Sequence, residues 1–193
     1  MVKIKACGMT NLDDCLKAEE LGVDFIGFVF YRPSERFILP QNARKMREAM
    51  GPSIKTIGVF VDESDEEMRR IVDYCNLDYV QVYRESSLAS TIRAFRVAHA
   101  LPSAIPGEGL LLFDSFTAAI GGSGQAFPLD LVAGQPFLDR AFIAGGINEE
   151  NVADVLRLKP FGVDLVSSLE SYPGKKDHAK FERFVKTVRS LDS

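Results

Sequence analysis

The chain of 193 residues contains no tryptophan, only two histidines and only three cysteines. Two histidines, His99 and His178, cannot supply a His-rich metal site. The cysteines are odd in number and lack metal-site spacing, which indicates free thiols in a reducing compartment rather than a disulfide framework. These scarcities predict a cytoplasmic protein without a bound metal.

Positive charge and long apolar runs are scarce as well. The formal net charge of −4 leaves no basic stripe to displace counterions from a phosphate backbone, so we expect no nucleic-acid partner. No apolar run is long enough to span a bilayer, and the N-terminal MVKIKACGM leads directly into strand-like sequence without a secretory signal. With 46% apolar and 26% charged residues, the composition predicts one globular domain over residues 1–193.

Short apolar runs recur along the chain and predict buried parallel strands. Each run is nearly continuous and rich in β-branched or aromatic residues, as expected of strands covered on both faces. The eight predicted strands are residues 2–7, 25–30, 56–61, 79–83, 92–97, 110–114, 141–144 and 163–166.

Amphipathic segments with helix-start signals separate most of these runs. Strand–helix alternation of this kind predicts parallel strands with right-handed crossovers. The expected helix starts are Thr10 or Asn11, Pro40, Ser64 with Glu67 as a capping box, and Asn148, and a last helix is expected over 175–191.

The connections on either side of the fifth strand do not fit this pattern. Residues 84–91 are too few for a helical crossover, which needs about a dozen residues. The next connection, 98–109, contains Pro102 and Pro106 and is poorly suited to a helix. We therefore predict an α/β fold, a single (β/α)8 TIM-type barrel trimmed at its fourth and fifth βα units.

Two residues at predicted strand ends suit proton transfer, because function in such barrels gathers at the carboxyl ends of the strands. Cys7 ends the first strand and would act as a general base if nearby cations lowered its pKa, while the alternative is a small buried apolar residue. Asp114 ends the apolar run LLLFD. Partial desolvation there would raise its pKa and make it a proton donor, the alternative being a turn aspartate.

Other residues at this end of the barrel suit anions. Bare backbone amides bind phosphate without a cationic side chain, and phosphate sites in these barrels follow the seventh and eighth strands. Arg36 has the planar fork that clamps a carboxylate, although a surface arginine is the default interpretation from pattern alone. The candidate phosphate residues are Gly122, Ser123 and Gly124 in a GGSG stretch, Gly145 and Gly146, and Ser167.

Blocks of sequence in the same order resemble the phosphoribosylanthranilate isomerase family of tryptophan biosynthesis. The likeness runs from about residue 2 to 190. The blocks are KACGMT at 5–10, GFVF at 27–30, Arg36, GVF at 58–60, Asp114-Ser115, GGSG at 121–124, AGGIN at 144–148 with Asn151, and PGKKD at 173–177.

The resemblance implies an Amadori rearrangement of N-(5′-phosphoribosyl)anthranilate that needs no cofactor. It assigns Asp114 as the general acid that opens the furanose ring and Cys7 as the general base that removes the C2′ proton. It implies that Arg36 binds the anthranilate carboxylate and that the Gly145-Gly146 and Ser167 loops bind the phosphate. The expected partner is therefore a small phosphorylated molecule, and the chain would act as a monomer or a homodimer.

The chain departs from the family pattern after its fourth strand, where Tyr83-Arg84 replaces the usual His-Gly pair. A phenol cannot replace imidazole as a base near neutral pH. Two alternatives therefore stay open beside an active isomerase. One is a non-catalytic sugar-phosphate-binding barrel, and the other is an aminoaldose isomerase of the histidine pathway, which would more typically carry an aspartate where this chain has Cys7.

Overall fold

Eight parallel strands form a closed barrel in chain order. The computed structural model describes residues 1–115 and 127–192. Every predicted strand is present within a residue of its expected bounds. The strands are β1 (Lys3–Cys7), β2 (Phe25–Val29), β3 (Lys55–Phe60), β4 (Tyr79–Val82), β5 (Thr91–Val97), β6 (Leu110–Ser115), β7 (Ala141–Ala144) and β8 (Gly162–Leu165).

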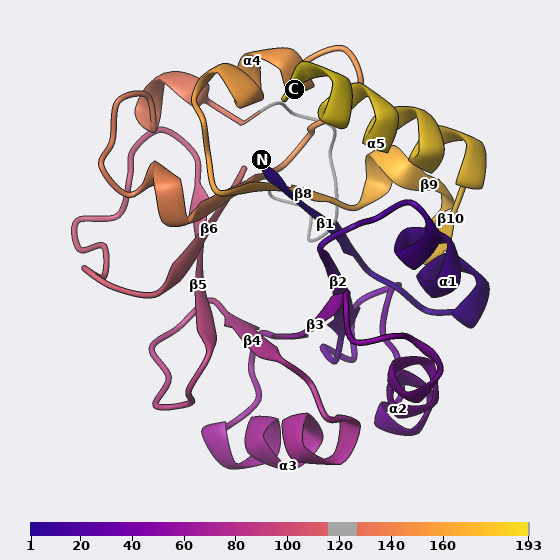
Figure 1. Ribbon diagram of the computed structural model, residues 1–193. Helices are drawn as coiled ribbons and strands as arrows, with labels where there is room; N and C mark the ends of the chain where they lie inside the picture. Colours follow the sequence, from indigo (N-terminus) through magenta and orange to yellow (C-terminus); the bar gives the residue numbers. More distant parts are fainter. Residues whose placement is uncertain (116–126, 193) are drawn as a thin grey trace.

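Helices cover part of the barrel's outside (Figure 1). The α-helices are α1 (Leu12–Glu20), α2 (Pro40–Ala49), α3 (Asp65–Cys75), α4 (Val152–Arg157) and α5 (His178–Leu191). Short 3-10 turns are η1 (Leu129–Leu131), η2 (Leu138–Arg140) and η3 (Ser167–Leu169), and a hairpin joins β9 (Glu170–Tyr172) to β10 (Lys175–Lys176). Among the described residues, no helix has the length and apolar character needed to cross a membrane.

The helix starts follow the capping signals in three cases. Asn11 accepts a hydrogen bond from the Asp14 amide at 3.1 Å, Pro40 opens α2, and Ser64 forms the predicted capping box at α3.

Two helix starts differ from the prediction. Asn148 does not cap α4: its side chain accepts hydrogen bonds from the amides of Glu150 and Asn151, which closes a turn and delays the helix to Val152. The last helix begins at His178 rather than at residue 175, because residues 175 and 176 pair with β9.

The predicted trimming of the barrel is confirmed. Within the described stretch 83–109, β5 is the sole regular element, and the connections on both sides of it contain no helix. In Figure 1 the outer ring of helices is accordingly open beside β5 and β6, where loops take their place. The barrel nevertheless closes, because β4 pairs with β5 and β5 with β6 in parallel register.

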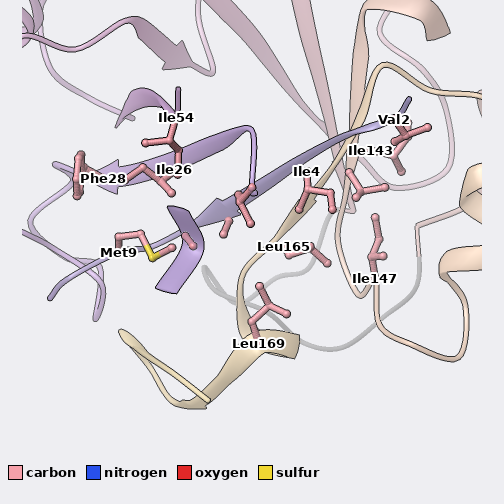
Figure 2. Packing of buried hydrophobic residues seen from close by; sticks show 14 of the residues in the cluster. Val2, Ile4, Met9, Ile26, Phe28, Ile54, Ile143, Ile147, Leu165 and Leu169 are labelled. Atoms are coloured by element: carbon pink, nitrogen blue, oxygen red, sulfur yellow. The ribbon is translucent and has the colours of Figure 1, made fainter. Parts of the chain in front are cut away.

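Buried apolar side chains form two layers, one on each face of the strands. Figure 2 shows part of the outer layer, in which Ile4, Ile26 and Leu165 point from β1, β2 and β8 toward the covering segments. The inner layer closes the amino-terminal half of the barrel with aromatic rings. Phe25 and Phe142 meet edge to face with centroids 5.4 Å apart. This plug leaves the polar inward-facing residues at the carboxyl end.

Candidate active site

Strand register places a row of mostly charged residues across the barrel interior. Lys5 of β1 pairs with Asp164 of β8, Asp164 with Ala144 of β7, Ala144 with Asp114 of β6, and Asp114 with Arg96 of β5. We call these five residues the interior row. Its two cations, Lys5 and Arg96, stand at the ends of the row, and the small Ala144 separates the two carboxylates between them.

Asp114, for which the sequence predicted a role as proton donor, lies near the end of β6 with its side chain toward the barrel interior. It is inward-facing because Leu112, two residues earlier on β6, belongs to the inner apolar layer. Burial, reinforced by the negative charge of Asp164, raises the pKa of Asp114 to about 6, against the opposing effect of Lys5 and Arg96. A carboxyl group with this pKa is partly protonated near neutral pH and can act as a general acid.

Cys7 faces the same interior from the last position of β1 and is 5% exposed. The cations that a thiolate base requires are present in Lys5 and Lys176, but they do not lower its pKa below the ordinary value. Burial prevails and raises the pKa of Cys7 above 9.0, with Asp164 adding to the rise. The resting side chain is therefore a thiol, and the thiolate is a minor form that these two cations stabilise.

Gly27 of β2 provides the space that the Cys7 sulfur occupies. It is the register partner of Cys7, and a Cβ at this position would stand 2.6 Å from Sγ. Glycine is therefore required here by close approach, since φ at Gly27 is in the ordinary range.

Replacing Gly27 with alanine should lower turnover, because the added methyl group displaces the sulfur from its position. Small misplacements of a reacting group carry large rate penalties, and we expect a loss on the order of tenfold in kcat. Steady-state kinetics of Gly27→Ala measure the effect. Gly107→Ala is the matched control, because a Cβ at Gly107 meets no atom within 4 Å. Equal loss in both variants would contradict the assignment.

Lys5 and Asp164 form an ion pair inside the barrel. Lys5 Nζ lies 2.9 Å from Asp164 Oδ1, and the side chains are 0% and 5% exposed. Burial alone would lower the pKa of Lys5, but the carboxylate outweighs it and raises the pKa above its ordinary value. Lys5 therefore stays protonated.

Tyr83 and Arg96 lie at the β4 and β5 side of the site. The Arg96 guanidinium carbon is 4.8 Å from the centroid of the Tyr83 ring, a cation–π contact. Burial, reinforced by the negative charge of Asp114, raises the pKa of Tyr83, so its phenol stays neutral. Tyr83 stands at the position where the family pattern has a histidine.

Arg36 is held by a buried carboxylate. Its Nε and Nη2 atoms donate to Glu170 at 2.9 and 2.6 Å, and Gly8, with φ of +75°, lets the backbone pass close to the arginine side chain. Glu170 also accepts from the buried Lys176, whose Nζ donates to the Cys7 carbonyl oxygen at 2.6 Å. Although burial would raise the pKa of Glu170, Arg36 and Lys176 hold it below its ordinary value. Arg36 is thus an oriented arginine, and Nη1 remains outside the bidentate pair.

Gly145, Gly146 and Ser167 follow β7 and β8, as predicted. A Cβ at Gly145 would stand 2.0 Å from Ser115 Oγ, so this turn excludes a side chain. The backbone amides of Gly146 and Ser167 donate no loop or turn hydrogen bond within the described part of the chain. Gly122, Ser123 and Gly124 lie outside the described residues.

The sequence interpretation missed the buried cations of the site, Lys5 and Lys176, and Asp164. A signal for Lys5 was present. Lys3 and Lys5 alternate with apolar residues in the first strand, which indicates that one face of an otherwise buried strand carries charge. No comparable signal marks Lys176, because its burial depends on the fold of the β9–β10 hairpin.

Comparison with known proteins gives one consistent result. A family model described as N-(5'phosphoribosyl)anthranilate (PRA) isomerase matches residues 4–187. The N-(5'-phosphoribosyl)anthranilate isomerase of Thermotoga maritima is 36% identical over 207 residues, covering 99% of this chain and 100% of that protein.

Solved structures agree with the sequence matches. The phosphoribosyl anthranilate isomerase of Thermotoga maritima has a TM-score of 0.85 at 34% identity, over 98% of this chain and 100% of that chain. A phosphoribosyl anthranilate isomerase in complex with reduced 1-(o-carboxyphenylamino)-1-deoxyribulose 5-phosphate has a TM-score of 0.79 at 31% identity, over the same shares of the two chains.

Proposed function

The chain belongs to the N-(5'-phosphoribosyl)anthranilate isomerase family of tryptophan biosynthesis, and from this we propose that it converts N-(5′-phosphoribosyl)anthranilate to 1-(2-carboxyphenylamino)-1-deoxyribulose 5-phosphate with Asp114 and Cys7 as its proton-transfer residues. The observation that carries the assignment is the inward-facing Asp114 carboxyl, whose pKa of about 6 suits a proton donor. The non-catalytic binding barrel is not favoured, because the relatives are isomerases over the full length of the chain.

Asp114 begins the reaction as the acid. It gives its proton to the furanose ring oxygen, the C1′–O4′ bond breaks, and the anilino nitrogen lone pair forms a C1′=N iminium. The Cys7 thiolate then takes the C2′ proton, and the released electron pair forms C1′=C2′ and neutralises the nitrogen. In the final tautomerisation C1′ gains a proton and the 2′-hydroxyl loses one, which yields the ketone. After the first two steps Asp114 is a carboxylate and Cys7 is a thiol. The last two proton movements return Asp114 to its protonated form and Cys7 to its thiolate form.

The substrate carries an anion at each end, and the site offers a group for each. Arg36 takes the anthranilate carboxylate, supported by its fixed orientation against Glu170. The loops of Gly145-Gly146 and Ser167 take the phosphate, supported by the backbone amides of Gly146 and Ser167. Gly122, Ser123 and Gly124 remain a prediction for the same phosphate. We also infer a cytoplasmic location, since Cys7, Cys15 and Cys75 are free thiols.

A direct assay tests the proposed function. Freshly generated phosphoribosylanthranilate is fluorescent, and the wild-type chain should accelerate the decay of this fluorescence. A chain that binds the substrate but shows no turnover above the buffer rate would instead support the binding-barrel alternative.

Arg36→Ala should mainly raise KM, by roughly tenfold or more, because a charge-assisted contact to the substrate is lost while the proton-transfer residues remain. The same assay at varied substrate concentration measures it. Arg32→Ala is the control, since Arg32 stacks on Phe37 in the same loop and does not contact Glu170. An unchanged KM in Arg36→Ala would remove the carboxylate assignment.

A further inference from the structure

The Lys5–Asp164 ion pair has no part in the proton transfers proposed above. Taking two charges out of water is costly, and their mutual attraction often fails to compensate, so a buried ion pair is weak evidence for a role in stability. The inner face around it is apolar, with Phe25, Ile57 and Phe142 in the same layer. Replacing a buried ion pair with apolar residues of similar volume is often neutral or even stabilising. The buried charges therefore call for a functional explanation.

Lys3 shows that strand β1 does not need a buried cation. It lies two residues before Lys5 on the same face of the strand and pairs with Asp24 at 2.8 Å, but its side chain is 43% exposed. Both lysines thus have a carboxylate partner, Asp24 directly before β2 for Lys3 and Asp164 of β8 for Lys5. The difference is that the Lys5 ammonium is enclosed in the interior row.

The Lys5 ammonium has a second neighbour, the Cys7 sulfur. Lys5 and Cys7 are alternate residues of β1 and project into the same interior, where the positive charge of Lys5 favours the thiolate form of Cys7. Asp164 holds the ammonium from the opposite side at 2.9 Å. The other charged or titratable groups that act on Cys7 are Lys176 of β10, Arg36 of the β2–α2 loop and Tyr83 after β4. Among these, Lys5 is the cation on the same strand as Cys7, and its charge is the largest influence that favours the thiolate.

We propose that Lys5 is a positioning residue for Cys7: its buried ammonium, oriented by Asp164, compensates the negative charge of the sulfur whenever Cys7 loses its proton. This inference rests on the proposed function of Cys7. Lys5 keeps its own proton throughout, and the thiol proton leaves to solvent before the C2′ proton is taken. Asp164 acts with the opposite sign, because a carboxylate near the sulfur disfavours the thiolate.

Lys5 favours the Cys7 thiolate and Asp164 disfavours it. Substitutions of the two residues should therefore have opposite effects on thiolate formation, which a merely structural role would not produce. The pH dependence of Cys7 alkylation by iodoacetamide, followed at the peptide level by mass spectrometry, gives the midpoint of thiolate formation independently of Cys15 and Cys75. In Lys5→Met the midpoint should rise by about one pH unit or more, equivalent to a tenfold loss of thiolate at neutral pH. In Asp164→Asn it should fall. Disruption of packing alone would not move the two midpoints in opposite directions.

Activity and matched variants complete the test. Lys5→Met should lower kcat by about tenfold or more with KM nearly unchanged, while Lys5→Arg retains the cation and should keep the wild-type midpoint. Lys3→Met is the control and should alter neither midpoint nor kcat. Circular dichroism shows whether each variant is folded. If Lys5→Met does not fold, the proposal is judged by whether the alkylation midpoint of Asp164→Asn falls or rises.

The proposal would be overturned if the midpoint of Cys7 alkylation in Lys5→Met equalled that of the wild type, or if the midpoint in Asp164→Asn were raised. The proposed function fails by a separate result, because it is judged by wild-type turnover and not by alkylation.

Discussion

In the Asp114→Asn variant, turnover of phosphoribosylanthranilate falls by about 10²–10⁴-fold, while KM changes little. The amide has the shape of the carboxyl group but has no acidic proton to transfer to the ring oxygen, and losing a general acid removes a rate factor of this size. The structural basis is the half-buried carboxyl between Ala144 and Arg96 in the interior row. The fluorescence assay gives kcat and KM.

Asp24→Asn is the control for Asp114→Asn. Asp24 is also a strand-associated carboxylate with an ion-pair partner, but it pairs with Lys3 and Arg189 at the other end of the barrel. This substitution should reduce thermal stability without a matching loss of kcat. An Asp114→Asn variant that retains a tenth or more of the wild-type kcat would exclude Asp114 as the acid.

The pH dependence of wild-type kcat/KM follows from the same two groups. Catalysis needs protonated Asp114, with a pKa of about 6, together with deprotonated Cys7, whose pKa lies above 9.0. Below the lower pKa activity rises with pH, because thiolate increases while the carboxyl stays protonated. Between the two values the gain in thiolate cancels the loss of protonated Asp114, and above the pKa of Cys7 activity falls. Residual activity in Asp114→Asn should show no break near pH 6.

Cys7→Ser should lower kcat by about 10²–10⁴-fold. The serine hydroxyl is a far weaker acid than a thiol, so the oxyanion base is not populated even with Lys5 beside it, and the C2′ proton stays in place. Substrate affinity should persist, because Arg36 and the phosphate loops do not depend on the sulfur. Single-turnover fluorescence decay separates binding from the lost proton transfer.

Cys75→Ser is the matched control for Cys7→Ser. The Cys75 thiol donates to the Pro40 carbonyl at the α2–α3 contact, and a hydroxyl can make the same hydrogen bond. We expect wild-type kinetics from it. Activity of Cys7→Ser within tenfold of the wild type would mean that another group removes the proton.

Some parts of the site were predictable from sequence because they are local. Asp114 ends an apolar run and Cys7 ends another, so strand periodicity alone placed both at the carboxyl end of the barrel. The helix starts at Asn11, Pro40 and Ser64 were equally local, because capping depends on side chains within one turn of the helix. The start of α4 was missed because Asn148 makes the same type of side-chain contact in a turn as it would in a cap.

Other parts of the site depend on residues that are distant in sequence. The Arg36–Glu170 pair joins residues 134 positions apart, and the Lys5–Asp164 pair joins residues 159 apart. No pattern along the chain links these partners, because they meet through barrel closure between β1 and β8 and through the β9–β10 hairpin. The raised pKa of Asp114 also depends on the closed barrel. The barrel buries the carboxyl group and brings the charge of Asp164 on β8 near it, although β7 lies between the two strands.

The sequence by itself determined the strands, most helix starts, the trimming around β5 and the position of Cys7 and Asp114 at the ends of their strands. These features follow from short-range periodicity, from the conformational limits of proline and from the length of a connection. Only the tertiary structure decided that Arg36 is held by Glu170, that Cys7 rests as a thiol and that Lys5 is enclosed beside it. Burial and electrostatic interaction are properties of the assembled barrel, where strands remote in the chain bring their charges within hydrogen-bonding distance.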